Sequence, residues 1–169
     1  MGGMRLVIGI DPGIRGAIAW YCPDLGTLTT KPLPVLWRLV NKKKRHYVDA
    51  RTLFTWLTQD YGHFDKTVIC EAPHAMPGAG ATSLFSFGVA CGTITGVIES
   101  AHVSAPFKQI IRIDPSVWKR ALGCSSDKNR TRALAASVFP ANADDFARQS
   151  DDGKAEAALL AHYAVTRGA

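Results

Sequence analysis

The stretch Leu6-Val-Ile-Gly-Ile-Asp-Pro-Gly13 decides the fold prediction, because it joins a short apolar run to an acid and a turn. An unbroken apolar run of this length is typical of a strand that is buried on both faces, and the Pro and Gly after it mark a turn. The stretch Gly16-Ala-Ile-Ala-Trp-Tyr21 resumes the strand pattern. The two segments are therefore expected to form a hairpin, with a third strand within 26–33.

Two further apolar runs predict strands, Thr67-Val-Ile-Cys-Glu71 and Gln109-Ile-Ile-Arg-Ile113. Asp49 is placed as the N-cap of a helix that extends to about residue 61. Other helices are expected at 82–102, after Pro115, at 128–139 and at 151–166, whereas 34–47 has no clear assignment. This order predicts one α/β domain over residues 1–169, with a mixed five-stranded sheet, its first three strands antiparallel, and helices on both faces.

The composition is that of a soluble globular protein of 169 residues, with 47% apolar and 20% charged side chains. The formal net charge of +6 favours a polyanionic partner, with nucleic acid ahead of an anionic membrane surface. The four cysteines are scattered and form no C-x-x-C pair. We therefore expect neither a zinc site nor a disulfide framework, and a reducing intracellular setting.

The stretch 77–98 carries no charged side chain and has glycines at four-residue spacing, Gly88, Gly92 and Gly96. A membrane helix would show the same small-residue pattern, but here small and polar residues dilute the segment, and its length only just reaches a span. We therefore predict no membrane span. The glycine stripe permits close packing, either against the sheet or against a second subunit.

Acidic residues occupy particular places in the predicted elements. Asp11 and Glu71 each end a buried strand, and ligands of open α/β sheets collect beyond the carboxyl ends of the strands. At the start of the last helix, Asp152 and Glu156 are four residues apart and share a face, which leaves Asp151 as the better N-cap. Each signal alone is common in turns, loops and caps. Their joint occurrence predicts one acidic site.

Such a set of carboxylates indicates a metal centre. Clustered carboxylates raise one another's pKa unless a cation neutralises them. Oxygen ligands without His or Cys select Mg²⁺ or Mn²⁺. Two such ions about 4 Å apart clamp the attacking and leaving oxygens of a phosphoryl displacement. The acids therefore predict hydrolysis of a phosphodiester.

Several segments together resemble a known family. They are Ile8-Gly-Ile-Asp-Pro-Gly13 followed by Gly16-Ala17, Val68-Ile-Cys-Glu-Ala72, Asp114-Pro-Ser-Val-Trp-Lys119, Lys128 with the Ala-x-x-x-Phe-Pro that ends at Pro140, and Asp152-Gly-Lys-Ala-Glu-Ala-Ala-Leu-Leu-Ala161. In these segments the chain resembles the RuvC-type Holliday junction resolvases, in particular phage and bacterial members. The resemblance covers nearly the whole chain apart from 34–47 and the loop after Glu71.

The resemblance implies a ribonuclease H-like fold, a homodimer, and Mg²⁺-dependent cutting of four-way DNA junctions by paired nicks in recombination, repair or phage DNA processing. It implies two Mg²⁺ ions per site, replaceable by Mn²⁺, and a cytoplasmic, DNA-associated protein. The catalytic, metal-binding acids would be Asp11, Glu71, Asp152 and Glu156. The family often has Asp at the position of Glu156 and spaces its last two acids three apart, so Asp151 stays open as an alternative ligand.

Basic and aromatic residues near these motifs predict a DNA-binding surface. Lys119 follows Trp118 in the family-like motif, and a lysine near the metals, such as Lys128, would stabilise charge in the transition state. In similar proteins an aromatic residue after the second acidic strand stacks on junction bases, although Phe in a helix is more often in the core. The run 42–45 is interpreted as a phosphate-contacting loop rather than a targeting signal. The predicted DNA contacts are Lys119, Lys128, Arg130, Arg132, Phe85 and Phe87.

Other functions remain open from the sequence. A ribonuclease H-like nuclease that cuts RNA–DNA hybrids or flap-like branched DNA would need the same acids. A module that binds branched DNA without cutting would result if the fourth acid is misplaced. A nucleotide-dependent protein of the actin and sugar-kinase type also carries Asp-x-Gly before a hairpin, but that fold normally needs two domains and a longer chain.

Overall fold

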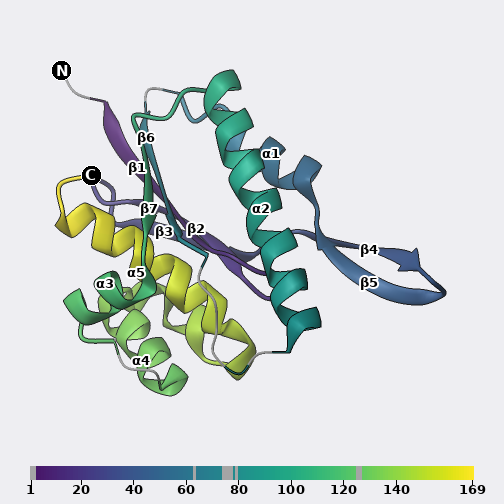
Figure 1. Ribbon diagram of the computed structural model, residues 1–169. Helices are drawn as coiled ribbons and strands as arrows, with labels where there is room; N and C mark the ends of the chain where they lie inside the picture. The colour runs from purple at the N-terminus through teal and green to yellow at the C-terminus, as the bar shows by residue number, and fades with distance from the viewer. Residues whose placement is uncertain (1–2, 63, 74–77, 79, 125–126) are drawn as a thin grey trace.

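The computed structural model describes residues 3–62, 64–73, 78, 80–124 and 127–169. At its centre lies a five-stranded sheet of order β3-β2-β1-β6-β7 (Figure 1). Strands β1, β2 and β3 are antiparallel, and β6 and β7 run parallel to β1. The predicted mixed sheet is therefore confirmed. The strands are β1 (Met4–Asp11), β2 (Ala17–Cys22), β3 (Thr27–Pro32), β6 (Phe64–Glu71) and β7 (Gln109–Ile113).

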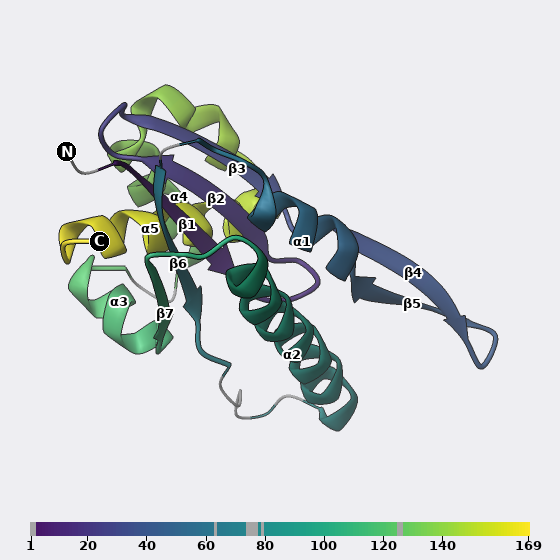
Figure 2. The same ribbon diagram turned by 90° about the horizontal axis from the view of Figure 1, so that it is seen from above.

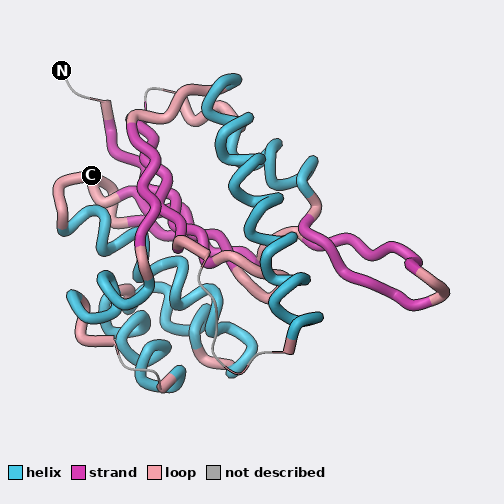
Figure 3. Tube along the Cα trace, in the orientation of Figure 1, coloured by secondary structure: helices cyan, strands magenta, loops and turns pink. Residues whose placement is uncertain are grey.

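Helices cover both faces of this sheet, as predicted (Figures 1 and 3). Helices α1 (Ala50–Thr58) and α2 (Ala81–Ser104) lie on one face, where Ile8 and Ile10 of β1 contribute to the core. On the other face Val7 packs with the helices α3 (Pro115–Ala121), α4 (Lys128–Val138) and α5 (Asp152–Thr166). Because both faces are covered, β1 is apolar along its whole centre instead of alternating.

A separate two-stranded hairpin, β4 (Val35–Val40) and β5 (Lys43–Val48), projects from the body of the molecule (Figures 1 and 2). Its two-residue turn has positive φ at Asn41 (50°) and Lys42 (61°). Positive φ at both central residues is the geometry of a type I′ turn, which matches the twist of paired strands. The sequence left this segment unassigned because most of its side chains are exposed, so no buried face marks it.

The ends of the helices agree with some capping predictions and not with others. The Asp49 carboxylate accepts a hydrogen bond from the Thr52 amide at 3.2 Å, so the predicted N-cap is confirmed. Asp151 occupies the N-cap position of α5, as predicted, but its side chain makes no capping bond there and pairs with Arg148 and Lys154 instead. The predicted N-cap position is therefore confirmed, although the Asp151 side chain does not cap α5. Two 3₁₀ turns that the sequence did not indicate lead into α5, at η1 (Pro140–Phe146) and η2 (Gln149–Asp151).

Helix α2, of 24 residues, is long and apolar enough, by length and composition, to cross a membrane, with a mean hydropathy of 1.6 over an 18-residue window. In this fold one face of α2 packs on the sheet through residues that include Ile94 and Ile98. The glycine stripe lies elsewhere on the helix, since a Cβ added at Gly88, Gly92 or Gly96 would meet no atom within 4 Å. Of the two uses considered for the stripe, packing against the sheet is excluded.

Candidate metal centre and cleft

Two neighbouring strands bring the first two acids together. Strands β1 and β6 are parallel with Ile10 opposite Cys70, so the residues that follow, Asp11 and Glu71, end side by side. Carboxylate oxygens of Asp11, Glu71 and Glu156 all lie within 4.8 Å of one another. These three predicted acids therefore form one cluster at the carboxyl ends of β1 and β6, which we call the carboxylate cluster.

Two glycines allow α5 to place Glu156 beside the ends of these two strands. A Cβ at Gly9 would lie 2.1 Å from the carbonyl oxygen of Ala157, so α5 crosses β1 at a distance that no side chain permits. A Cβ at Gly153 would lie 3.0 Å from Oδ2 of Asp11. The first turn of α5 therefore lies directly against the end of β1, and Glu156, one turn further, reaches the cluster.

Helix α3 supplies the neighbours that hold the carboxylates in place. The buried Trp118 donates a hydrogen bond from Nε1 to Oε1 of Glu71 at 2.7 Å. The next residue, Lys119, donates from Nζ to Oε2 of Glu156 at 2.9 Å and lies 3.9 Å from Oε1 of Glu71. The sequence did not indicate this role of Trp118. The feature of the sequence that could have indicated this role is the Asp-Pro-Ser-Val-Trp-Lys motif, in which the Trp stands next to the Lys.

Burial and close charges shift the pKa values of Asp11 and Lys119 in and beside the cluster. Burial raises the pKa of Asp11 well above its usual range, and the nearby Glu156 and Glu71 raise it further. Burial lowers the pKa of Lys119, but the attraction of Glu156 and Glu71 outweighs it, so the pKa is raised and the ammonium stays charged. Three carboxylates beside the Lys119 ammonium, with no His or Cys in the group, form a donor set that fits a hard divalent cation.

The fourth predicted acid, Asp152, lies beside the cluster but is held by cations. Arg132 donates a hydrogen bond from Nη1 to its carboxylate, and Nζ of Lys128 lies 3.3 Å from Oδ2. Asp151 is buried in ion pairs of 3.1 Å with Arg148 and Lys154. Burial raises the pKa of Asp151, but its hydrogen bonds to these two cations outweigh the burial and lower it. Asp151 therefore serves as an anchor for the turn before α5, and the geometry gives it no part in the cluster.

The predicted basic DNA contacts fall into two groups. Arg132 is buried and Lys119 is partly buried, and both bind carboxylates, so their placement differs from the expected phosphate-contacting surface. The reason is that both side chains offset acids within the site. Lys128 and Arg130 are exposed at the start of α4, as a phosphate contact requires.

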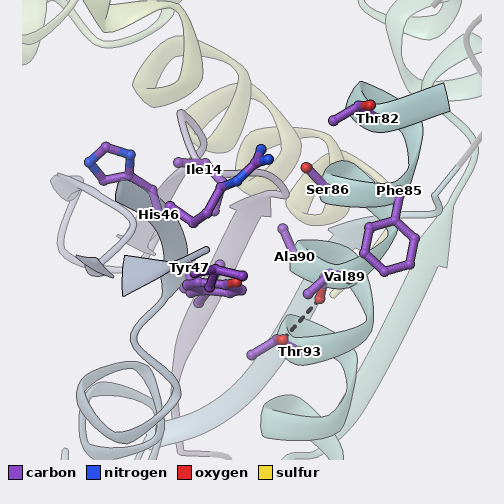
Figure 4. A pocket seen from close by; sticks show the side chains of 12 residues that line it. Ile14, His46, Tyr47, Thr82, Phe85, Ser86, Val89, Ala90 and Thr93 are labelled. Carbon is purple, nitrogen blue, oxygen red and sulfur yellow. Dashed lines mark hydrogen bonds between the residues drawn. The ribbon is translucent and has the colours of Figure 1, made fainter. Parts of the chain in front are cut away.

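A cleft of about 1120 Å³ lies beside the cluster, and its lining includes Asp11, Glu156, Asp152, Lys128 and Phe87. The ring of Phe87 lies against Gly13, 3.7 Å from where a Cβ would be. Phe85 is 74% exposed and lines a second pocket of about 230 Å³ between β5 and α2, opposite Tyr47 (Figure 4). Phe85 therefore presents a free ring to solvent, whereas Phe87 forms part of the cleft wall.

Comparisons with known proteins find likeness at the level of structure. No family model matches the sequence, and no curated protein matches it. A structure of T. thermophilus RuvC in complex with a Holliday junction substrate is 14% identical, with 96% of each chain covered and a TM-score of 0.56. Another structure of Thermus thermophilus RuvC, also 14% identical with 96% of each chain covered, has a TM-score of 0.54.

The yeast mitochondrial Holliday junction resolvase Ydc2 is 13% identical to this chain, with a TM-score of 0.51 over 96% of this chain and 78% of that one. These likenesses, together with the strand order, confirm the fold that the motifs predicted. The chain has the ribonuclease H-like fold of the RuvC-type Holliday junction resolvases.

Proposed function

We propose that this chain is a divalent-metal-dependent endonuclease that cuts four-way DNA junctions. The observation that carries the proposal is the carboxylate cluster of Asp11, Glu71 and Glu156, of which Asp11 and Glu156 line a cleft of about 1120 Å³. The fold shared with resolvases from bacteria and yeast mitochondria supports the same function. The net charge of +6 supports a polyanionic substrate.

In this proposal Asp11, Glu71 and Glu156 hold Mg²⁺, or Mn²⁺ in its place, and Asp152 completes a site for two ions. Divalent cations supply such sites with an activated water and with positive charge for the departing oxygen. Trp118 fixes the orientation of Glu71 through its hydrogen bond of 2.7 Å. Lys119 limits the repulsion among the carboxylates, and Arg132 and Lys128 orient Asp152.

Phosphate contacts of the substrate are assigned to the exposed Lys128, which lines the cleft, and to the exposed Arg130 in the same turn of α4. Phe85, whose ring is 74% exposed, is assigned to stacking on an unpaired base of the junction. Phe87 shapes the cleft wall near the carboxylates. We place this activity on DNA in the cytoplasm.

Paired nicks need two active sites, so the proposal includes a homodimer. The outward face of α2 supports it, because Val89 and Val103 are exposed there and Gly92 and Gly96 leave open space. A second copy of this face could approach closely along the glycines. Gly92→Glu tests this contact. The substitution meets nothing within 4 Å in one chain, so the monomer should fold, while light scattering should show loss of the dimer.

The experiment that tests the function is cleavage of a synthetic four-way junction in Mg²⁺, Mn²⁺ or EDTA, with matched duplex, flap and RNA–DNA hybrid controls. We expect symmetric, metal-dependent nicks confined to the junction. Equal cutting of flaps or hybrids would keep the metal centre and change the substrate. Tight junction binding without cutting in any metal would contradict the nuclease and favour a binding module.

Variants of the two acids on α5 test how the site is divided. Because Glu156 lies in the cluster and Asp152 is held by Arg132, Glu156→Gln should lower the cleavage rate more than Asp152→Asn does. We expect a loss of about 10³-fold or more for Glu156→Gln, the scale of removing a group that acts on the transition state. Equal losses of cleavage rate in both variants would show that Asp152 contributes as much to cleavage as Glu156.

A further inference from the structure

The hairpin β4–β5 holds most of the excess positive charge of the protein. Between Val35 and Val48 there are five Lys and Arg residues and no acid, in a chain whose formal net charge is +6. Within the part of the chain that the structure describes, none of the five forms a salt bridge with a carboxylate. The five cations are Arg38, Lys42, Lys43, Lys44 and Arg45.

The shape of the hairpin presents most of these charges away from the body. All side chains from Trp37 to His46 are exposed, and the ribbon extends beyond the helices in both views (Figures 1 and 2). Strands of six residues at about 3.4 Å per residue span roughly 20 Å. The type I′ turn at Asn41 and Lys42 fixes the ribbon as a defined arm.

The base of the hairpin is continuous with the candidate active site. Val35 and Arg45 line the cleft that contains Asp11 and Glu156. Tyr47 lies across a pocket from α2 and faces Val89 and Phe85 (Figure 4). A DNA strand bound in the cleft would therefore leave it along the hairpin.

We propose that the hairpin is an arm that contacts the backbone of a DNA duplex next to the bound phosphodiester. This inference rests on the proposed function for the position of the DNA, and it adds a binding surface outside the cleft. A two-stranded ribbon is narrow enough to enter the major groove, and unpaired lysines supply the charge that phosphates attract. A span of roughly 20 Å would reach about six base pairs at 3.4 Å each.

One face of the ribbon adds an apolar contact to the charge. Trp37 is 56% exposed and Leu39 is 68% exposed, and their cross-strand partners are His46 and Lys44. Nζ of Lys44 lies 4.6 Å from the centre of the Trp37 ring, a cation–π contact that orients the ammonium. This face therefore combines a fixed cation with a flat ring, which suits the sugar and phosphate edge of a groove.

The test compares two triple variants of equal charge change. The arm variant carries Lys42→Asn, Lys43→Gln and Lys44→Gln, and Asn is chosen at 42 because it tolerates positive φ. The control variant carries Lys66→Gln, Lys108→Gln and Arg167→Gln. Lys66 and Lys108 lie near the start of β6 and β7, at the end of the sheet opposite Glu71.

Binding of a labelled four-way junction is measured in EDTA across a salt series. Each lost phosphate contact should flatten the slope of log affinity against log salt by about 0.9. For the arm variant we expect a slope flatter by about 2 to 3 and an affinity at 0.1 M salt about 10- to 100-fold weaker. We also expect loss of backbone protection over about six base pairs of one duplex of the DNA junction. Trp37→Ala should weaken binding without changing the slope.

The control variant should keep both the slope and the footprint. Equal effects of the two triple variants would overturn the arm, because only total charge would then matter. Unchanged junction binding by the arm variant would also overturn the proposal, and the hairpin would then be a candidate contact for a protein or membrane partner. Cleavage by the unmodified protein is measured alongside. An arm effect without any cutting would support the arm and contradict the nuclease, and cutting without an arm effect would do the reverse.

Discussion

Replacing Asp11 by Asn should stabilise the metal-free protein and remove its response to divalent cations. Asp11 lies half-buried beside Glu71 and Glu156, with carboxylate oxygens within 4.8 Å. Burial and these two acids raise its pKa well above the usual range. An amide of the same shape has no charge to bury, so the substitution removes the repulsion and keeps the packing.

The size of the effect follows from Coulomb's law. At an effective dielectric constant of about 20, two unit charges 4.8 Å apart repel by roughly 3.5 kcal/mol. Attraction to Lys119 and partial protonation of the cluster offset much of this. We therefore expect Asp11→Asn to raise the free energy of unfolding by about 1 to 3 kcal/mol, or the melting temperature by about 2 to 10 °C for a domain of this size.

The gain in unfolding free energy from Asp11→Asn should increase with pH. Because the pKa of Asp11 is higher in the folded than in the unfolded protein, the folded state binds the proton more tightly. The unmodified protein therefore loses stability relative to the variant as pH rises from about 3.9 through the raised pKa. The difference should be small near pH 4 and complete well above the folded-state pKa.

Thermal unfolding in EDTA and in Mg²⁺ or Mn²⁺ measures both effects, with Asp24→Asn as the control at a surface salt bridge. Metal should raise the melting temperature of the unmodified protein by mass action and leave Asp11→Asn nearly unchanged. A variant that is less stable than the unmodified protein in EDTA at pH 8, and still stabilised by metal, would refute the reasoning.

Three further outcomes follow from single contacts. Trp118→Phe removes the hydrogen bond to Glu71 and should weaken Mn²⁺ binding by about 10- to 100-fold in calorimetric titration, whereas an unchanged affinity would show that the bond does not orient the ligand. Gly9→Ala places a Cβ 2.1 Å from a carbonyl oxygen of α5. The substitution should lower the free energy of unfolding, measured by denaturant titration, by more than about 3 kcal/mol. A loss below about 1 kcal/mol would contradict the close crossing of α5 and β1. Burial raises the pKa of Cys70 to about 12, so alkylation of the folded protein at pH 8, followed by mass spectrometry, should label the partly exposed Cys124 first, and faster labelling of Cys70 would contradict its burial.

Features that depend on a short stretch of chain were predictable from the sequence. The apolar run of β1 and the acid at its end required a strand covered on both faces, and the same pattern recurs at β6 and Glu71. Parallel neighbours then place both acids at one edge. Because the spacing of Asp152 and Glu156 put both on one face of a helix, the sequence directed attention to the right turn of α5.

Features that depend on distant contacts were not predictable in the same way. The sequence could not divide the roles of Asp152 and Glu156, because Arg132, which holds Asp152, comes from α4, 20 residues earlier. The hydrogen bond from Trp118 to Glu71 joins residues 47 positions apart. The hairpin β4–β5 has few buried side chains, so the hydrophobic pattern that identifies strands is absent there.

The central claim is that Asp11, Glu71 and Glu156 bind the divalent cation that the proposed cleavage requires. The most direct test is anomalous X-ray scattering from crystals of the protein soaked in Mn²⁺, with Glu156→Gln crystals as the comparison. The account predicts an Mn²⁺ peak bonded to oxygens of all three carboxylates, and its loss or marked weakening in the variant. Full Mn²⁺ occupancy elsewhere, with Lys119 still bonded to Glu156 and no peak between the carboxylates, would contradict it.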